Sequence, residues 1–324
     1  MKYITSNSNN PYHNLALEEV LFRNVEGSIL YLWQNDNTIV VGKNQNTFEE
    51  INAAEVERQN INVVRRGTGG GAVYHDLGNL NFSVIVDIKE DEFYEYSSFL
   101  EPVIRALKYF KIEATLQGRN DLVVNGAKIS GNAQMLSGNR VLHHGTLLIN
   151  SDLSVLSAAL KVSKSKLQSK GIKSVRSRVA NISDVTSADI NIQTLEKKII
   201  EEYCGKESQE LFLDDMFLQK VEKLAKDKYS SYAWVYGESP KSNFTSEKKF
   251  SFGTLKVYLD VENGFIKSCN FSGDFLDTRD ISKVAKVLEG TVYLRKNIKD
   301  KLNEIHIEKY LKNMQANELT DMFF

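Results

Sequence analysis

Residues 65–76 are the segment of this chain best suited to bind an anion. They read Arg-Arg-Gly-Thr-Gly-Gly-Gly-Ala-Val-Tyr-His-Asp, with four glycines in the five positions 67–71. Glycine lets the backbone approach a ligand closely and turn consecutive amide N–H groups toward an anion. Arg65 and Arg66 add bidentate donors for phosphate or carboxylate, and Thr68 adds a hydroxyl. We therefore predict an anion site, against the alternative of a flexible turn with basic neighbours.

Two common phosphate-binding patterns do not fit this segment. The glycines are not followed by the Gly-Lys-Ser/Thr of a Walker A loop. The spacing of Gly67, Gly69 and Ala72 leads into the strand-like residues AVYH, whereas a dinucleotide fingerprint leads into a helix.

A second candidate segment is a hairpin around Asn125-Gly126, between DLVV and AKIS. This pair is typical of a two-residue turn, and strand alternation then predicts Lys128, Ser130 and Asn132 on one face. Lys128 could meet a ligand there, although an exposed hairpin lysine is the commoner outcome. Asp121, at the far end of the partner strand, could hold a divalent cation between phosphates.

A third segment, residues 141–149, reads as a strand containing His143, His144 and Thr146. Neighbouring strand residues point to opposite faces, so the two histidines cannot chelate one metal locally. We expect one imidazole to line a pocket and the other to be structural. Trp33, at the end of an earlier strand, is either the wall of an apolar pocket or part of the core.

Seven cations and no acidic residue lie between Asp152 and Asp184. The run QSKGIKSVRSRVAN within it is either a solvated face or a mobile basic loop that covers an anion or docks an acidic partner.

The elements that must position these residues are short strands and capped helices. Apolar, β-branched runs predict strands at 28–33, 38–41, 61–64 and 80–86. Pro11 after Asn9 and Asn10 predicts the start of one helix, and a capping box of Ser98 and Glu101 predicts another. Because strands and helices do not alternate strictly, we predict an α/β (α+β) fold with a mixed or antiparallel sheet and helices beside it.

A polar stretch at 238–248 predicts a linker. Beyond it, a hairpin at Asn263-Gly264 and two or three helices predict a small α+β domain of two strands. We therefore divide the 324 residues into domains at 1–245 and 246–324.

Composition excludes several classes of protein. The first twenty residues lack the apolar stretch of a secretory signal, and no window reaches the ~18–20 apolar residues of a membrane span. The net charge of −1 gives no general attraction to nucleic acid, and we expect neither a nucleic-acid nor a membrane partner. Cys204 and Cys269 stand alone, which fits a reducing cytoplasm.

Taken together, the segments resemble the lipoate–protein ligase A family over nearly the whole chain. The motifs that carry the resemblance follow one another in the order RRGTGGGAVYHDLGN, GRNDLVVNGAKISGNAQ, HHGTLLINSDLS and KGIKSVRSRVANIS. The resemblance implies a catalytic domain of the biotin/lipoate ligase-like fold and a small C-terminal accessory domain. It also implies that lipoate and ATP give lipoyl-AMP and pyrophosphate, and that the lipoyl group passes to a lysine of a lipoyl domain.

The resemblance also implies roles for individual residues. Lys128 is the expected catalytic residue and contacts both substrates. The residues expected to bind ATP or the adenylate are Arg66, Gly71, Ala72, Val73, Tyr74, Asn79, Asp121 and Lys128. The residues expected to bind lipoate are Trp33, Arg65, Thr68, Gly70, His144 and Lys128. Asp121 is the expected Mg²⁺ ligand.

The expected partners are lipoic acid and the apo lipoyl domains of dehydrogenase-complex E2 acyltransferases and of the glycine cleavage H protein. We expect a monomer. The alternatives are a lipoyl or octanoyl transferase of the same fold, which would use a cysteine and no ATP, and a non-catalytic lipoyl-domain-binding protein. A biotin ligase fits less well, because its usual loop resembles GRGRxGR.

Overall fold

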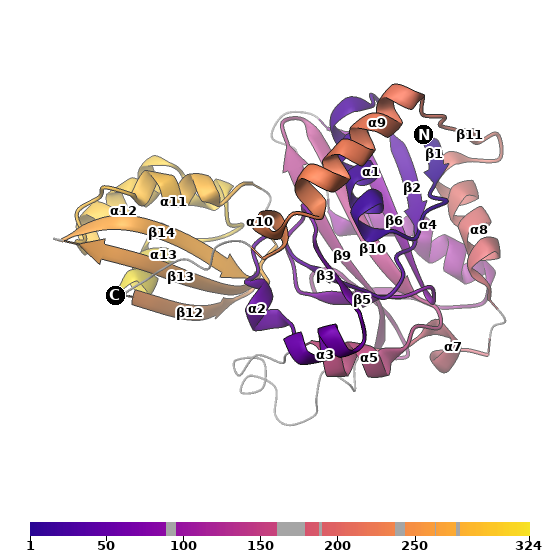
Figure 1. Cartoon of the computed structure of the whole chain (residues 1–324), viewed down its shortest axis with the longest axis horizontal. Helices are drawn as coiled ribbons and strands as arrows, with labels where there is room; N and C mark the ends of the chain where they lie inside the picture. The colour runs from indigo at the N-terminus through magenta and orange to yellow at the C-terminus, as the bar shows by residue number, and fades with distance from the viewer. Residues whose placement is uncertain (89–94, 161–178, 188–189, 237–243, 263, 277–278) are drawn as a thin grey trace.

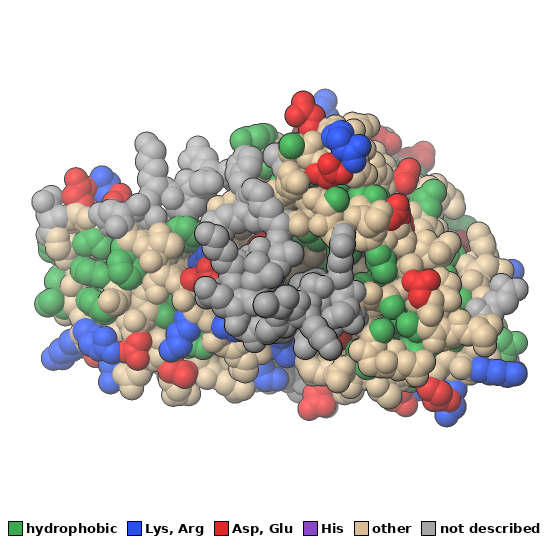
Figure 2. Space-filling model, turned by 90° about the horizontal axis from the view of Figure 1, so that it is seen from below, with side chains coloured by type: hydrophobic (Ala, Val, Ile, Leu, Met, Phe, Trp, Pro, Cys, Tyr) green, Lys and Arg blue, Asp and Glu red, His purple; other side chains and the backbone are tan. Residues whose placement is uncertain are grey.

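The computed structural model describes residues 1–88, 95–160, 179–187, 190–236, 244–262, 264–276 and 279–324. A larger unit of sheets and helices holds the N-terminus, and a smaller unit at the other end of the long axis holds the C-terminus (Figure 1). Lys and Arg side chains are interspersed with Asp and Glu over both units in Figure 2. No helix in the described part of the chain is long and apolar enough to cross a membrane.

The larger unit is built on an eight-stranded mixed sheet with the order β11-β1-β2-β6-β10-β9-β8-β7. Its strands are β1 (Lys2–Thr5), β2 (Ile29–Trp33), β6 (Asn79–Asp87), β7 (Thr115–Gln117), β8 (Asp121–Val124), β9 (Ala127–Ser137), β10 (Arg140–Leu148) and β11 (Gln209–Glu210). β1 pairs in parallel with β2 and β11, and the remaining neighbours are antiparallel. This arrangement confirms the predicted mixed sheet.

A second sheet of three strands carries the glycine-rich segment. β3 (Thr38–Val41) lies between β4 (Asn62–Arg65), which is parallel to it, and β5 (Val73–His75), which is antiparallel. The glycine-rich residues 67–71 therefore form the connection from β4 to β5, at the end of a short buried sheet.

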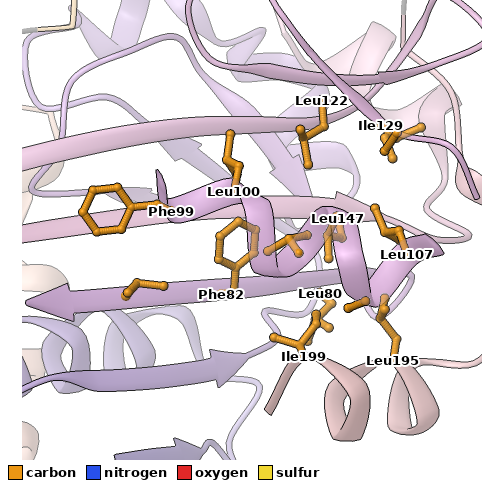
Figure 3. Packing of buried hydrophobic residues seen from close by; sticks show 14 of the residues in the cluster. Leu80, Phe82, Phe99, Leu100, Leu107, Leu122, Ile129, Leu147, Leu195 and Ile199 are labelled. Atoms are coloured by element: carbon orange, nitrogen blue, oxygen red, sulfur yellow. The ribbon is translucent and has the colours of Figure 1, made fainter. Parts of the chain in front are cut away.

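Helices pack on both faces of the large sheet. The helices of the larger unit are α1 (Pro11–Asn24), α2 (Thr47–Glu50), α3 (Ala53–Arg58), α4 (Tyr96–Tyr109), α5 (Leu153–Ala159), α7 (Ile182–Val185), α8 (Ile192–Cys204), α9 (Asp215–Leu224), the π-helix η2 (Ala225–Tyr229) and α10 (Tyr232–Val235). α4 and α8 pack on one face, where Leu107, Leu195 and Ile199 meet Phe82 and Leu147 (Figure 3). α1 belongs to a second hydrophobic cluster that joins the other face to the small sheet.

The start of α1 is set by the residues at its own N-terminus. The side chain of Asn10 accepts hydrogen bonds from the amides of Tyr12 and His13 at 2.9 and 3.3 Å, and Pro11 occupies the first turn. Proline is favourable there because the first amides of a helix have no carbonyl partner within it. The predicted cap at Asn9 or Asn10 is thus confirmed.

The start of α4 differs from the prediction. The helix begins at Tyr96, after Glu95, instead of at Ser98. Pro102 consequently lies inside the helix and outside its first turn, so the amide hydrogen bond to Ser98 is missing. The capping-box pattern was misleading because Tyr96, before the predicted cap, also packs against the core and is part of the helix.

The smaller unit has a core of its own beneath a three-stranded antiparallel sheet. Its elements are β12 (Phe244–Phe250), β13 (Gly253–Glu262), β14 (Phe265–Gly273), α11 (Ser282–Leu288), α12 (Arg295–Glu304), α13 (Ala316–Thr320) and the 3₁₀ turns Ile307–Lys309 and Asp321–Phe323. β13 and β14 are the predicted hairpin, although position 263 of its turn lies outside the described residues. A small α+β unit at the C-terminus is confirmed.

The predicted linker was wrong for residues 244–248, because these belong to β12, and the unit has three strands instead of two. β12 is an edge strand whose pairing with β13 runs from Phe244 to Phe250. Its exposed charges, including Glu247 and Lys248, are typical of an edge strand and look like a linker in the sequence. Residues 238–243 of the predicted linker lie outside the described chain.

Candidate active site

A cavity of about 130 Å³ lies between α1, the glycine-rich segment and strands β2, β6, β9 and β10 of the large sheet. Several predicted site residues from separate parts of the sequence line it. Of the residues expected to bind ATP or the adenylate, those that line the cavity are Arg66, Gly71, Ala72, Val73 and Lys128. Of the residues expected to bind lipoate and not ATP, those that line the cavity are Trp33, Gly70 and His144. The structure therefore brings the first three sequence motifs to one place.

Arg66 holds the glycine-rich segment in shape from within. Its guanidinium donates to the carbonyl oxygens of Gly69 and Gly71 at 2.6 and 2.8 Å, and to the Thr68 hydroxyl at 3.0 Å. Burial lowers its pKa to about 10, so Arg66 remains charged at neutral pH. Gly70 has a φ of +89°, which only glycine adopts readily, and a Cβ there would lie 2.9 Å from the guanidinium.

Arg65 does not reach the cavity, contrary to the predicted lipoate contact. Its guanidinium binds main-chain carbonyls of Gly42, Lys43, Gln45, Trp234 and Val235, together with the hydroxyl of Thr47. These bonds engage all of its N–H donors, so Arg65 ties the loop after β3 to α10. The sequence showed two adjacent cations, but strand alternation sends their side chains in opposite directions.

Lys128 reaches the cavity through an irregularity in its hairpin. The register between β8 and β9 shifts by one residue between Lys128 and Ser130, which leaves Ile129 as the extra residue of a β-bulge. Lys128 consequently shares a face with Gly131, where a Cβ would lie 3.0 Å from Nζ. The prediction that Lys128 shares a face with Ser130 and Asn132 was wrong, because strict alternation assumes an unbroken ladder.

Asn125 and Gly126 form the predicted turn with φ values of 51° and 80°. Asp121 lies opposite Gly131 on the neighbouring strand, and its Oδ1 is 2.7 Å from Lys128 Nζ. The predicted catalytic lysine and the predicted metal ligand therefore form an ion pair, and their side chains are 31% and 37% exposed. Asp121 itself does not line the cavity.

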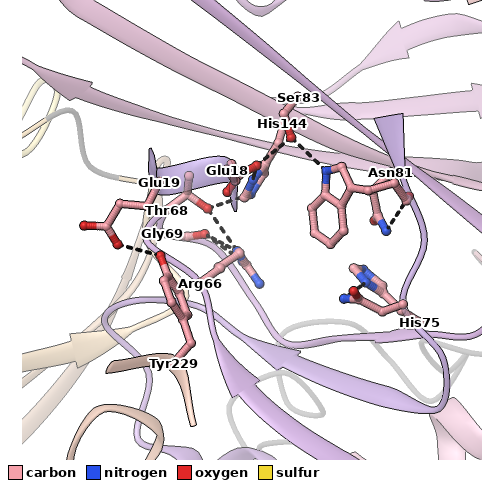
Figure 4. Close-up of polar contacts among 12 residues, drawn as sticks. Glu18, Glu19, Arg66, Thr68, Gly69, His75, Asn81, Ser83, His144 and Tyr229 are labelled. Atoms are coloured by element: carbon pink, nitrogen blue, oxygen red, sulfur yellow. Dashed lines mark hydrogen bonds and ion pairs between the residues drawn. The ribbon is translucent and has the colours of Figure 1, made fainter. Parts of the chain in front are cut away.

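A buried polar network supports the opposite wall (Figure 4). His144 lies with Nδ1 2.9 Å from Glu18 Oε1 and with Nε2 2.8 Å from the Thr68 hydroxyl. Glu18 also accepts from Ser83 at 2.5 Å, and Trp33 Nε1 donates to the same Ser83 hydroxyl at 2.9 Å. Trp33 and His144, the two side chains predicted to wall the lipoate pocket, are thus held in place by the Glu18 carboxylate, His144 directly and Trp33 through Ser83.

The direction of these bonds assigns the roles of the His144 ring. A carboxylate can only accept, so Nδ1 of His144 carries a proton and donates to Glu18, while Nε2 shares a hydrogen bond with the Thr68 hydroxyl. Thr68 in turn accepts from Arg66, so it lies behind His144 and outside the cavity lining, where it joins the glycine-rich segment to the sheet. His143 points to the other face and stacks on Phe99 at 4.8 Å, which confirms that only one histidine of the pair faces the pocket.

Two further predicted residues lie outside the cavity lining. The hydroxyl of Tyr74 donates to Asn37 at 3.1 Å, and its side chain is buried in the cluster around the small sheet. Asn79 is fully buried and donates to Asn81 at 3.0 Å, and Asn81 lines the cavity.

Sequence reasoning gave no role to Glu18 or to several wall residues, among them His75 and Asn81. Glu18 carried a usable signal, because it and Glu19 are two acidic residues between Leu17 and Val20 of an otherwise apolar stretch. A carboxylate on a buried helix face needs partners, and it often marks a functional site.

The remaining predicted features lie away from this cavity. The basic run at 161–178 falls outside the described residues. Cys204 ends α8 and Cys269 lies in the core of the smaller unit, and burial raises the pKa of both thiols. Neither cysteine lines the cavity, so the geometry offers no thiol nucleophile there.

Two family profiles match the chain, one for each unit. Residues 10–204 match the lipoyl protein ligase A/B catalytic domain, and residues 239–323 match the bacterial lipoate protein ligase C-terminus. The fold and the cavity therefore define a two-unit protein of the lipoyl ligase class.

Individual proteins are similar over most of the chain. Lipoate–protein ligase 1 of Staphylococcus aureus is 42% identical over 323 residues, with 98% of each chain covered. The crystal structure of LipL1 of P. falciparum in complex with lipoate has a TM-score of 0.81 at 30% identity, covering 99% of this chain and 98% of that one. A lipoate–protein ligase A bound with ATP has a TM-score of 0.63 at 27% identity, covering 73% and 98%. The chain belongs to the lipoate–protein ligase family, whose members are ATP-dependent ligases.

Proposed function

We propose that this protein joins lipoate to ATP, giving lipoyl-AMP and pyrophosphate, and then transfers the lipoyl group to a lysine of a lipoyl domain. The observation that carries the proposal is that one cavity is lined by Lys128, by the glycine-rich residues Gly70 and Gly71, and by the apolar ring of Trp33. Lipoate is bound by the similar LipL1, and ATP by the similar ligase A.

The chemistry of the first step calls for cations. A carboxylate must attack the α-phosphate of a triphosphate, and the two anions repel each other unless positive charge lies between them. Lys128 Nζ is the group proposed to contact both the lipoyl carboxylate and the α-phosphate. Arg66 and the main-chain amides near Gly71 are proposed to hold the phosphates. Trp33 and His144 would form the walls of the pocket around the lipoyl chain.

A magnesium ion fits this site only as a companion of ATP. Among the described residues no group of three or more His, Cys, Asp or Glu side chains could hold a metal. Mg²⁺ commonly binds through one or two carboxylates, water and substrate phosphates, so the single carboxylate of Asp121 suits that pattern. Bound there, Mg²⁺ would neutralise phosphate charge, and its arrival would compete with Lys128 for Asp121.

The second step needs an opening for the carrier lysine. In this conformation the smaller unit touches the glycine-rich segment, where the Gly70 amide donates to the Phe275 carbonyl at 3.1 Å. The Gly273 amide likewise donates to Asn44 at 2.8 Å, and Lys43 pairs with Asp280 at 3.5 Å. We infer that these few contacts release when the smaller unit moves aside for a lipoyl domain.

Pyrophosphate release tests the first step. The full chain is incubated with ATP, Mg²⁺ and lipoate, and each component is left out in turn. The proposal predicts release only when all three are present. Release that does not need lipoate would overturn the proposal. Lipoylation from an acyl-carrier donor without ATP that is lost in Cys204→Ser would also overturn it and would favour a transferase. Binding of a lipoyl domain without any release would instead indicate a non-catalytic protein.

A further inference from the structure

One buried histidine of the cavity has no role in the account so far. His75, the last residue of β5, is 3% exposed and lines the cavity beside Trp33, whose ring centroid is 6.1 Å away. Its Nδ1 lies 3.2 Å from Asn35 Nδ2. Its Nε2 is buried and has no hydrogen-bond partner among the residues that the structure describes. A buried polar atom left in this way needs an explanation.

The surrounding bonds fix which ring nitrogen of His75 carries the proton. Asn14 Nδ2 donates to the Gln34 carbonyl at 2.7 Å, and Asn14 Oδ1 accepts from Tyr31 at 3.1 Å. Asn14 Nδ2 also donates to Asn35 Oδ1 at 3.0 Å, which leaves Asn35 Nδ2 as the group facing His75. An amide nitrogen only donates, so His75 Nδ1 accepts and Nε2 carries the hydrogen.

His75 is therefore a neutral donor. Burial, together with the charge of Arg66, lowers its pKa to about 3, so the ring stays uncharged at neutral pH. The charged groups that line the same cavity, Arg66 and Lys128, are also donors. The ring is held by Asn35 before any ligand arrives, so it need not reorganise on binding. A wall with this polarity suits a ligand that brings acceptor oxygens.

We propose that His75 contacts the substrate directly, with Nε2–H donating to an oxygen of the acyl-phosphate group of the adenylate. This inference rests on the proposed function, because it takes the adenylate as the occupant of the cavity. It gives His75 a binding role beside Lys128: Lys128 supplies charge, and His75 supplies a fixed neutral donor.

The tautomer is testable in the unmodified protein. Nitrogen-15 NMR of the full chain at pH 7, with His75 assigned by its absence in His75→Gln, should show the ring protonated at Nε2 only. A ring protonated at Nδ1 would overturn the proposal, because it would present an acceptor to the cavity. This measurement does not depend on activity.

A matched pair of variants tests the contact. In His75→Gln the side-chain amide nitrogen can lie near the position of Nε2, whereas His75→Asn keeps a group near Nδ1 and lacks the donor. The probe is an N-lipoyl sulfamoyl adenosine, in which a sulfamoyl group replaces the phosphate, and its affinity is measured by calorimetry. We expect His75→Asn to bind it about 10- to 100-fold more weakly than the native protein, as for loss of one donor to a charged oxygen.

His75→Gln should recover most of that affinity, and His143→Asn, which changes a buried histidine on the other face of the sheet, should retain it. Thermal unfolding of each variant checks that the fold persists. Equal binding by His75→Asn and the native protein would overturn the role of His75, while pyrophosphate release by the native protein would still support the proposed function. A native protein that neither binds the probe nor releases pyrophosphate would overturn both.

Discussion

Glu18 on α1 and His144 on β10 form a buried hydrogen bond of 2.9 Å between Oε1 and Nδ1, although 126 positions separate them in the chain. The carboxylate is 2% exposed and also accepts from Ser83. Through His144 and Thr68 the same carboxylate reaches the glycine-rich segment. One acidic side chain thus joins a helix, the large sheet and the proposed phosphate-binding loop.

Removing that carboxylate should weaken both the fold and the activity. Glu18→Ala leaves His144 and Ser83 without their acceptor, so we expect the free energy of unfolding to fall by about 2–3 kcal/mol. Lipoate-dependent pyrophosphate release should fall as the loop loses its support. Glu18→Gln keeps one acceptor and should lose less of both. Denaturant unfolding, with the exposed Glu57→Ala as control, checks this, and unchanged stability in Glu18→Ala would contradict it.

Lys128 should matter for chemistry and hardly for stability. Its pair with Asp121 is partly exposed, and such pairs contribute about 0–1 kcal/mol. Lys128→Ala should therefore fold within about 1 kcal/mol of the native protein and lose nearly all pyrophosphate release. Lys301→Ala, which breaks an exposed pair with Glu304 on α12, is the matched control and should keep its activity. Unchanged release in Lys128→Ala would remove this lysine from the mechanism.

Two glycines of one loop should respond differently to the same substitution. Gly70→Ala places a Cβ 2.9 Å from Arg66 at a φ of +89°, which costs about 1–2 kcal/mol and displaces the guanidinium. At Gly67 a Cβ would lie 3.6 Å from Met135 Sδ, an ordinary contact. Gly67→Ala should therefore stay near native stability and ATP affinity. Both variants are compared by thermal unfolding and ATP titration, and similar losses at the two positions would contradict this reading.

Two buried histidines should make the protein less stable in mild acid. Burial lowers the pKa of His75 to about 3 and that of His143 well below its ordinary value. Both histidines titrate at about 6.5 when the chain is unfolded, so below that pH only the unfolded chain gains these protons. The free energy of unfolding should then fall by about 1.4 kcal/mol per pH unit for each histidine as the pH drops, and their contribution should be constant above it.

Urea unfolding between pH 7.5 and 5.5 measures this slope. His75→Gln and His143→Gln should each reduce this slope by the contribution of one histidine. A slope that is the same in both variants and in the native protein would show that neither buried ring resists protonation.

Local chemistry made much of this protein predictable from its sequence. The cap at Asn10, the turn at Asn125-Gly126 and the glycine-rich connection after β4 each depend on residues within a few positions of one another. Their physical causes, a side-chain cap, positive φ values and small side chains, are local as well. The order of four motifs then sufficed to indicate the family.

The remaining features depend on contacts between distant segments. The face of Lys128 follows from the bulge at Ile129, and the direction of Arg65 follows from carbonyls of a loop and of α10. The partners of Glu18 come from β6 and β10. The sequence therefore showed that an acidic residue stands in an apolar stretch, but it could not show which residues it binds. β12 was taken for a linker because an exposed edge strand carries the same polar residues.

The central claim is that this protein lipoylates an acceptor protein with ATP, and the most direct test is to measure the intact mass of that acceptor. Apo lipoyl domains of a dehydrogenase-complex acyltransferase and an apo glycine-cleavage H protein are incubated with the full chain, ATP, Mg²⁺ and lipoic acid, and their intact masses are measured. We predict that at least one acceptor gains a single lipoyl group on lysine, only with ATP and only with Lys128 intact. An acceptor lipoylated equally well without ATP, or by Lys128→Ala, would contradict the account.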